Sequence, residues 1–312
     1  MAGPTASGKS GLALAMAEQL EDSVIINADS MQVYRELNLI SARPSPAELD
    51  RATHRLYGVL SGAERCSAGR WRQMALAEIA AAHEAGRWPI VVGGTGLYFK
   101  VLLEGIAEVP DVPDALIGDI QDRLAEIGEA AFRDELVNVD APAAARIERG
   151  DTQRLVRAAG VHAATGRSLS DWQSDQPVDG GLDMPVAKIA LLPERQAVYD
   201  RCDARFMAMI EAGGVAEVEA LMALNLDPAL PVMRAVGVPE LIQHLRGEID
   251  LRTAVSLAQQ ATRRYAKRQL TWIRNQMTDW HSVTNSDFPQ QSERFAEEIF
   301  SFIRNFTLTK KP

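Results

Sequence analysis

Apolar residues near the start of the chain follow a helix pattern and then a strand pattern. They recur every three or four positions over residues 9–20, which predicts an amphipathic helix. A Val-Ile-Ile run at 24–26 follows and indicates a short buried strand. The same order returns in a helix pattern at 67–85, with Ser67 as its expected N-cap, and in an apolar run at 89–92. Helices that alternate with buried strands predict a parallel α/β sheet.

The pattern of residues changes in the middle of the chain. Proline residues open this stretch and glycine residues close it. Inside it, residues 115–127 and 152–165 have helical patterns, and no strand pattern is evident. We therefore predict a helical insertion at 109–185, within a core formed by 1–108 and 186–312.

Strand and helix patterns resume after the insertion. Residues 186–192 predict a buried strand, and helical patterns follow at 197–212, 215–224, 239–246 and 253–276. A last apolar stripe predicts a packing helix over residues 293–306, with Phe295, Ile299, Phe302 and Phe306 on one side.

The first turn of the chain has a phosphate-binding motif. Its residues match G-x-x-x-x-G-K-[ST] at every fixed position: Gly3, Pro4, Thr5, Ala6, Ser7, Gly8, Lys9 and Ser10. Such a loop lets backbone N–H groups converge on phosphate oxygens, and the following helix adds its partial positive charge. Lys9 would neutralise the terminal phosphate and Ser10 would ligate Mg²⁺. The alternative is a glycine-rich turn with an incidental lysine.

A P-loop ordinarily follows a buried strand, but only two residues precede Gly3. Because no strand fits there, we expect either a natural start farther upstream or a shortened chain. In-frame upstream codons would then encode about five apolar residues, enough for a minimal strand.

Candidate functional residues follow the next two predicted strands. Asp29 follows the strand at 24–26, where it could accept a proton or cap the turn after it, and spacing alone favours neither. Gly93, Gly94 and Thr95 end the strand at 89–92, where many NTPases place an Mg²⁺-binding aspartate. The absence of that aspartate argues against simple ATP hydrolysis.

Composition and charge restrict the class of protein. The chain of 312 residues is 46% hydrophobic and 24% charged, and it has no long apolar run and no leader pattern. We therefore expect a cytoplasmic protein without membrane contact. Cys66 and Cys202 form no CxxC pair, which argues against a disulfide framework or zinc site.

One basic segment stands out in an acidic protein. The net charge is −9, but residues 251–278 contain six basic side chains and no acidic one. At ~100° per residue, Arg263, Lys267 and Arg274 share one helix face, and Arg264 and Arg268 widen it. This face predicts contacts with nucleic-acid phosphates, with a solvated basic surface as the alternative.

Five motifs in this order resemble those of the bacterial tRNA dimethylallyltransferase (tRNA isopentenyltransferase) family. They are G-P-T-A-S-G-K-S, N-A-D-S-M-Q-V-Y-R, V-G-G-T-G-L-Y, D-T-Q-R-L-V-R-A and K-R-Q-L-T-W-I-R. The resemblance runs from Gly3 to about Trp280. It implies a P-loop NTPase-like sheet and transfer of a dimethylallyl group from dimethylallyl diphosphate to N6 of the adenosine beside the tRNA anticodon.

The resemblance also implies roles for single residues. Asp29 would accept the N6 proton, Arg205 would help hold the diphosphate, and Thr95 would reach the reacting nucleotide. From the sequence alone, Arg205 is a solvated helix-surface residue. Mg²⁺ is the implied cofactor, the anticodon stem-loop is the implied partner, and we expect a monomer. The implied tRNA-binding residues are Asp29, Ser30, Met31, Gln32, Thr95, Gln153, Arg154, Leu155, Val156, Arg157, Arg234, Lys267, Arg268 and Arg274.

One motif departs from the family. After Gly237, many relatives continue with tyrosine and arginine, whereas Val238 and Pro239 stand here. This change removes one expected RNA contact. Three alternatives remain at this point: a P-loop kinase of small molecules, an isopentenyltransferase of free adenine nucleotides, and a non-catalytic RNA-binding ATPase.

Overall fold

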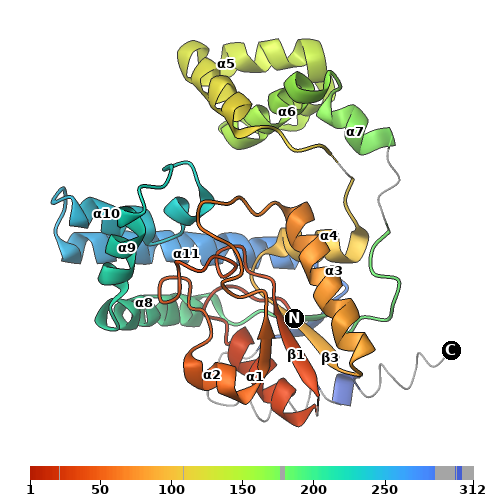
Figure 1. Cartoon of the computed structure of the whole chain (residues 1–312), viewed down its shortest axis with the longest axis vertical. Coiled ribbons are helices and arrows are strands. Elements are labelled where there is room, and N and C mark those ends of the chain that lie inside the picture. Colours follow the sequence, from red (N-terminus) through yellow and green to blue (C-terminus); the bar gives the residue numbers. More distant parts are fainter. Residues whose placement is uncertain (21, 108, 176–179, 285–298, 300, 304–312) are drawn as a thin grey trace. The chain divides into compact units, whose positions relative to one another are not determined.

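The structure is a computed structural model that describes the chain except for residues 21, 108, 176–179, 285–298, 300 and 304–312. The chain divides into two compact units (Figure 1). One unit combines Met1–Leu102 with Met184–Pro312, and the other is Leu103–Asp183. The second unit falls where the sequence predicts an insertion at 109–185.

The strands of the first unit run parallel. β1 (Ser23–Asn27) lies between β2 (Thr53–Arg55) and β3 (Trp88–Val92), and β4 (Ile189–Leu191) pairs with β5 (His281–Val283). The sequence predicts the strands that became β1, β3 and β4. It misses β2 and β5, which are three residues long and have no apolar run.

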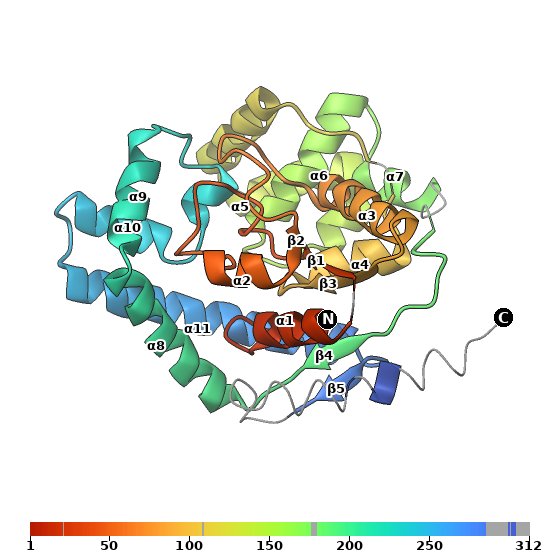
Figure 2. The same cartoon turned by 60° about the horizontal axis from the view of Figure 1, so that its bottom comes forward.

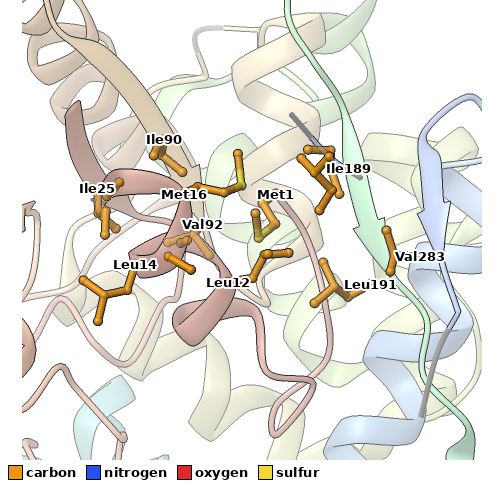
Figure 3. Packing of buried hydrophobic residues seen from close by; sticks show 14 residues of the cluster. Met1, Leu12, Leu14, Met16, Ile25, Ile90, Val92, Ile189, Leu191 and Val283 are labelled. Atoms are coloured by element: carbon orange, nitrogen blue, oxygen red, sulfur yellow. The ribbon is translucent and has the colours of Figure 1, made fainter. Parts of the chain in front are cut away.

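The first two residues join these two groups of strands. Ala2 forms parallel bridges with Gly93, beyond β3, and with Ala190 of β4. The Ala2 N–H donates to Ile189 O at 2.8 Å, and the Met1 side chain lies in the core beside α1 (Figure 3). The prediction that no strand fits before the P-loop is confirmed, because Ala2 forms isolated bridges there and no strand.

The helices of the first unit cover the sheet and build one side of the site. Figure 2 shows α1 (Lys9–Gln19) and α3 (Ala68–Glu84) on opposite faces of the sheet, and both pack on β1 and β3. The expected cap is confirmed, because the Ser67 hydroxyl accepts from the Arg70 N–H at 3.1 Å. The others are α2 (Pro46–Arg51), α4 (Gly96–Glu104), α8 (Arg195–Glu211), α9 (Gly214–Ala223), η1 (Pro231–Arg234), α10 (Val238–Leu245) and α11 (Leu251–Gln276).

Among its described residues, the second unit contains helices and no strand. α5 (Asp114–Arg146) bends at Gly128 and Asp140, and α6 (Thr152–Thr165) and α7 (Leu169–Asp175) complete it. Asp140 is buried, yet both its oxygens are satisfied, by the N–H groups of Ala143 at 3.0 Å and Ser170 at 3.1 Å. This carboxylate therefore fixes the bend in α5 against the start of α7.

The C-terminal packing helix expected at 293–306 lies mostly outside the described residues. Of its apolar stripe, Ile299 is fully buried in the sheet core and Phe302 packs against that core. Nothing further is described for Phe295 and Phe306.

Gly93 has no room for a side chain. A Cβ there would overlap the backbone of Ala28 at the end of β1. We expect Gly93→Ala to lower the free energy of unfolding by about 3 kcal/mol, because backbone cannot move aside as a side chain can. Gly11→Ala, with nothing within 4 Å, is the matched control. It should raise stability by about 0.5–1 kcal/mol. Urea denaturation of both variants measures this, and equal midpoints would contradict the close approach at Gly93.

Candidate phosphate-binding and transfer site

The P-loop curls because two of its residues adopt left-handed backbone conformations. Ala6 has φ 57° and Gly8, which precedes α1, has φ 89°. These two turns bring the free N–H groups of the first turn of α1 to the loop's inner side. Ser7 is buried, and among the described residues its hydroxyl has no hydrogen-bond partner. An unsatisfied buried hydroxyl inside an amide-lined loop is suited to an oxygen-rich anion.

Gln269 of α11 fixes the P-loop against the loop after β3. Its Oε1 accepts from the Thr5 N–H at 2.8 Å, and its Nε2 donates to Gly94 O at 2.8 Å. Gly94 must be glycine here, because a Cβ would meet the Gln269 amide. At Gly96 a Cβ would overlap the Trp272 ring, also on α11. The Gly-Gly-Thr-Gly run is thus a close docking surface for α11.

Two cations converge on the P-loop. Lys9 is half-buried, and desolvation lowers its pKa to about 8, opposed by the nearby Asp29 carboxylate. Arg205 of α8 donates to the Thr5 hydroxyl, and burial lowers its pKa. The solvated-surface interpretation of Arg205 is therefore wrong. Arg201, one turn earlier, donates to Ala6 O at 2.8 Å, a contact the sequence did not predict.

Asp29 acts as a cap with one oxygen and leaves the other available. Its Oδ1 accepts from the Met31 N–H at 3.0 Å, and Asn27 holds its backbone from the preceding strand. Within the described part of the chain, no hydrogen bond to Oδ2 is found. The carboxylate raises the pKa values of Lys9 and Arg205, so it lies within electrostatic reach of both cations. Asp29 could thus both cap the turn and accept a proton, so the two alternatives drawn from the sequence are compatible.

Thr95 ties the loop after β3 to the turn after β1. Its hydroxyl accepts from the Ser30 N–H at 3.0 Å, and its own N–H donates to Ala28 O at 3.2 Å. Tyr265 of α11 lies beside Thr95 and Gln269, and burial raises its pKa. Thr95 therefore holds the Asp29 turn in place.

A cavity of about 230 Å³ opens beside these groups. Its polar lining residues include Thr5, Asp29 and Arg205, together with Tyr265 and Arg268 of α11. Its apolar lining residues are Met31, Ile40, Phe206, Met209, Ala235 and Val236. The cavity therefore brings apolar side chains into the same space as Thr5 of the phosphate-binding loop.

The candidate RNA contacts on α11 divide into two groups. Lys267, Arg268 and Arg274 are exposed. Arg263 is not a free cation: its Nη1 donates to both carboxylate oxygens of Asp203 on α8 at 2.6 Å. Arg263 thus joins two helices, which corrects its assignment to the phosphate-facing group.

Other candidate contacts divide in a similar way. Arg234 is exposed and lines the cavity, whereas the Gln32 amide donates to Ser41 O and Ala42 O at 2.9 and 2.8 Å. Gln32 therefore holds a neighbouring loop, and its amide hydrogens are committed there.

In the second unit, some side chains of residues 153–157 are exposed and others are buried. Gln153 and Arg154 are exposed, but Leu155 and Val156 are buried. For these two apolar side chains the expectation of an RNA contact is corrected, because both are buried, and Leu155 lies in the hydrophobic core of its own unit. Arg157 donates to Pro110 O at 3.3 Å.

The donor set suits Mg²⁺ only when a phosphate is present. No group of three or more His, Cys, Asp or Glu side chains able to hold a metal occurs in the described residues. The exposed Ser10 hydroxyl at the start of α1 is the protein oxygen that could ligate Mg²⁺. Mg²⁺ prefers one or two protein oxygens plus water and phosphate, so the arrangement fits that ion.

Some functional residues were not singled out from the sequence. Gln269 had one signal, because it is an amide on the apolar face that Thr262, Ala266 and Ile273 share. A buried amide on such a face needs partners, and its partners here are the two loops. Tyr265 of the same helix lines the cavity. The cysteines are free, as expected, with Cys202 buried and Cys66 half-buried.

Together the parallel sheet, the P-loop and the adjoining apolar cavity define a P-loop enzyme that handles a small phosphorylated compound. Comparison with known proteins narrows this class. The sequence matches the IPP transferase family over residues 32–276, and the chain belongs to that family.

Relatives and solved structures agree with this family. A tRNA dimethylallyltransferase from Rhodospirillum rubrum is 50% identical over 309 residues, covering 99% of this chain and 94% of that protein. One from Paramagnetospirillum magneticum is 49% identical, covering 99% and 96%. A crystal structure of a tRNA isopentenylpyrophosphate transferase from Bacillus halodurans aligns with TM-score 0.69 and 28% identity, covering 99% and 97%.

A second solved structure supports the fold. It is a eukaryotic dimethylallyltransferase acting on tRNA, which aligns with TM-score 0.80 at 24% identity over 100% of this chain and 79% of that one. Among the described residues, no helix is both long and apolar enough to cross a bilayer.

Lys9 should make anion binding depend on pH. The free protein loses the Lys9 charge as pH rises through about 8, and a bound anion favours the charged form. The quantity to follow is the pyrophosphate affinity of the unmodified protein divided by the pyrophosphate affinity of Lys9→Met. We expect this ratio to be about tenfold lower at pH 9 than at pH 7. Titration calorimetry at both pH values measures this ratio. Lys267→Met should leave the pH dependence intact, and a ratio that does not change with pH would show that Lys9 does not meet the anion.

Proposed function

We propose that this chain transfers a dimethylallyl group from dimethylallyl diphosphate to N6 of the adenosine beside the tRNA anticodon. The product is N6-dimethylallyladenosine, and the work is expected in the cytoplasm, where tRNA is found. The observation that carries the proposal is a single cavity lined by Arg205, the Asp29 carboxylate and a set of apolar side chains. A diphosphate held at the loop would place a five-carbon group in that cavity.

The reaction needs one bond formed, one bond broken and one proton removed. The adenine N6 attacks C1 of the donor, the C1–oxygen bond breaks, and pyrophosphate leaves with the bonding electrons. The N6 lone pair is delocalised into the ring, so the nitrogen attacks well only if its proton is drawn off. Oδ2 of Asp29 is the acceptor we assign to that proton, while Oδ1 keeps the carboxylate oriented.

The P-loop cations stabilise the leaving group. Lys9 and Arg205 are desolvated before substrate arrives, so their charges act strongly on the negative charge that grows on pyrophosphate. Ser10 would hold Mg²⁺, which adds positive charge to the same oxygens. Ser7 and the first N–H groups of α1 complete the donor set.

The acceptor nucleotide must leave the stack of the RNA loop to reach Asp29. Thr95 and the turn after Asp29 would contact it, and Lys267, Arg268, Arg274 and Arg234 would contact phosphates. Gln153, Arg154 and Arg157 of the second unit remain predicted contacts. Because RNA is read in unpaired loops, an anticodon stem-loop suits these contacts.

The kinase and free-nucleotide alternatives have less support. The matched relatives act on tRNA by their names, and the basic face of α11 would have no use in an enzyme for free nucleotides. One experiment separates the alternatives: unmodified tRNA and dimethylallyl diphosphate are incubated with the protein, and nucleosides are analysed by mass. Gain of C5H8 on adenosine supports the proposal, and phosphate transfer from ATP would support a kinase.

Replacing Asp29 tests the proton acceptor. Asp29→Asn retains an oxygen that can accept from Met31 N–H, so the turn should persist. We expect the transfer rate to fall about 10²–10⁴-fold, the usual loss for a general base. Affinity for pyrophosphate should not fall, because a negative charge near the anion has been removed. Single-turnover transfer and calorimetry measure the two quantities, and an unchanged rate would exclude Asp29 from proton transfer.

Salt dependence tests the RNA face of α11. Lys267→Gln should reduce the slope of log affinity against log salt for an anticodon stem-loop by about 0.7–0.9, the value for one lost phosphate contact. Arg263→Gln is the matched control, because Arg263 is occupied by Asp203 and should leave the slope unchanged. Filter binding between 50 and 200 mM salt measures both slopes, and equal slopes for Lys267→Gln and the unmodified protein would place RNA elsewhere.

A further inference from the structure

The apolar wall of the cavity depends on a loop that has no helix or strand of its own. In residues 37–43, a bend at Asn38 precedes a turn at 39–42, and Ile40 and Ser41 of this loop line the cavity. Ile40 is only 8% exposed, although it belongs to a loop. Something outside the loop must therefore hold it in position.

Glu217 of α9 holds the loop through three consecutive backbone groups. Its Oε2 accepts from the N–H groups of Asn38 at 3.0 Å and Leu39 at 2.7 Å. Its Oε1 accepts from the Ile40 N–H at 3.0 Å. Successive N–H groups around a carboxylate form an anion-binding concavity, and hydrogen bonds to a charged acceptor are the strong ones. Glu217 itself does not line the cavity.

The other side of the loop is held as well. The Gln32 amide donates to the carbonyl groups of Ser41 and Ala42, and the Ser41 hydroxyl donates to Leu37 O at 2.7 Å. The loop therefore has its N–H side bound to α9 and its carbonyl side bound to the Asp29 turn. Its position relative to the donor pocket is fixed by these two contacts.

The Ile40 side chain is enclosed from behind. A Cβ on Gly214 would come within 3.0 Å of Ile40 Cδ1, so α9 approaches through a glycine. A Cβ on Gly237 would come within 2.8 Å of the Phe206 ring and 3.6 Å of Ile40 Cγ2. Ile40 and Phe206 thus rest against backbone that cannot move aside, and both side chains line the cavity.

We propose that Glu217 is a positioning residue that sets the length of the allylic chain the enzyme accepts. By fixing the loop, it makes Ile40, together with Phe206, the stop against which a five-carbon group ends. A ten-carbon donor would collide with this stop. The inference rests on the proposed function, because it presumes an allylic diphosphate in this cavity.

The test compares two donors in the same assay. Geranyl diphosphate has the same reacting end as dimethylallyl diphosphate and five more carbons. We expect Glu217→Gln to raise the kcat/KM ratio of geranyl to dimethylallyl donor about tenfold or more, since a loosened wall discriminates chain length less. The amide retains one acceptor oxygen, so the fold should persist. Thermal unfolding and pyrophosphate binding verify that it does.

Two further variants make the comparison sharp. Glu219→Gln changes the same charge on an exposed residue of the same helix, and it should leave the ratio of the two donors unchanged. Ile40→Ala opens the stop directly and should raise the ratio even if Glu217→Gln does not fold. Adding Glu217→Gln to Ile40→Ala should raise it no further, because both act through one wall.

The possible outcomes distinguish a failure of the proposed function from a failure of the chain-length stop. If the unmodified protein and Glu219→Gln transfer no dimethylallyl group to tRNA, the proposed function fails. If they do, but neither Ile40→Ala nor Glu217→Gln changes the donor ratio, the chain-length stop is refuted. A ratio raised by Ile40→Ala alone, with Glu217→Gln folded, would refute the role of Glu217. A change only in KM for tRNA would likewise overturn the proposal.

Discussion

The two hydrogen bonds of the Gln269 amide are the constraint on which the site depends. They connect the Thr5 N–H and the Gly94 carbonyl, from loops about ninety residues apart, to one side chain on α11. An amide offers both a donor and an acceptor, so it can join an N–H to a carbonyl where a carboxylate could not. The spacing of the P-loop and the Thr95 loop is thus set by α11, the same helix that presents the exposed basic side chains.

This arrangement gives α11 two tasks on two faces. The buried face, with Gln269 and Tyr265, sets the geometry around the phosphate-binding loop. The exposed face carries Lys267 and Arg274. Any displacement of the helix by a ligand on its basic face would move the Gln269 amide as well. A single helix therefore connects the proposed RNA-binding face with the proposed diphosphate site.

The sequence could predict much of the fold, because its strongest patterns are local. The P-loop, the strands at β1 and β3 and the cap at Ser67 follow from short-range periodicity and from turn chemistry. What it could not predict depends on contacts between distant residues. The bridge of Ala2 to β4 needs a strand nearly 190 residues away, and Arg263 was misjudged because its partner Asp203 lies on another helix. Helical periodicity shows which face is basic, but not which cation on it is already paired.

The same limit explains the positioning residues of the candidate site. Gln269 and Glu217 bind backbone groups. Every residue type has the same backbone groups, so these contacts leave no motif in the sequence. Their signals are indirect: an amide on an apolar helix face, and a carboxylate opposite a loop without regular structure. Groups that meet substrate belong to motifs because the chemistry fixes their type and spacing. Groups that hold those motifs in place need only the right donor or acceptor at the right distance, and that requirement becomes visible only once the fold brings α9 and α11 to the loops.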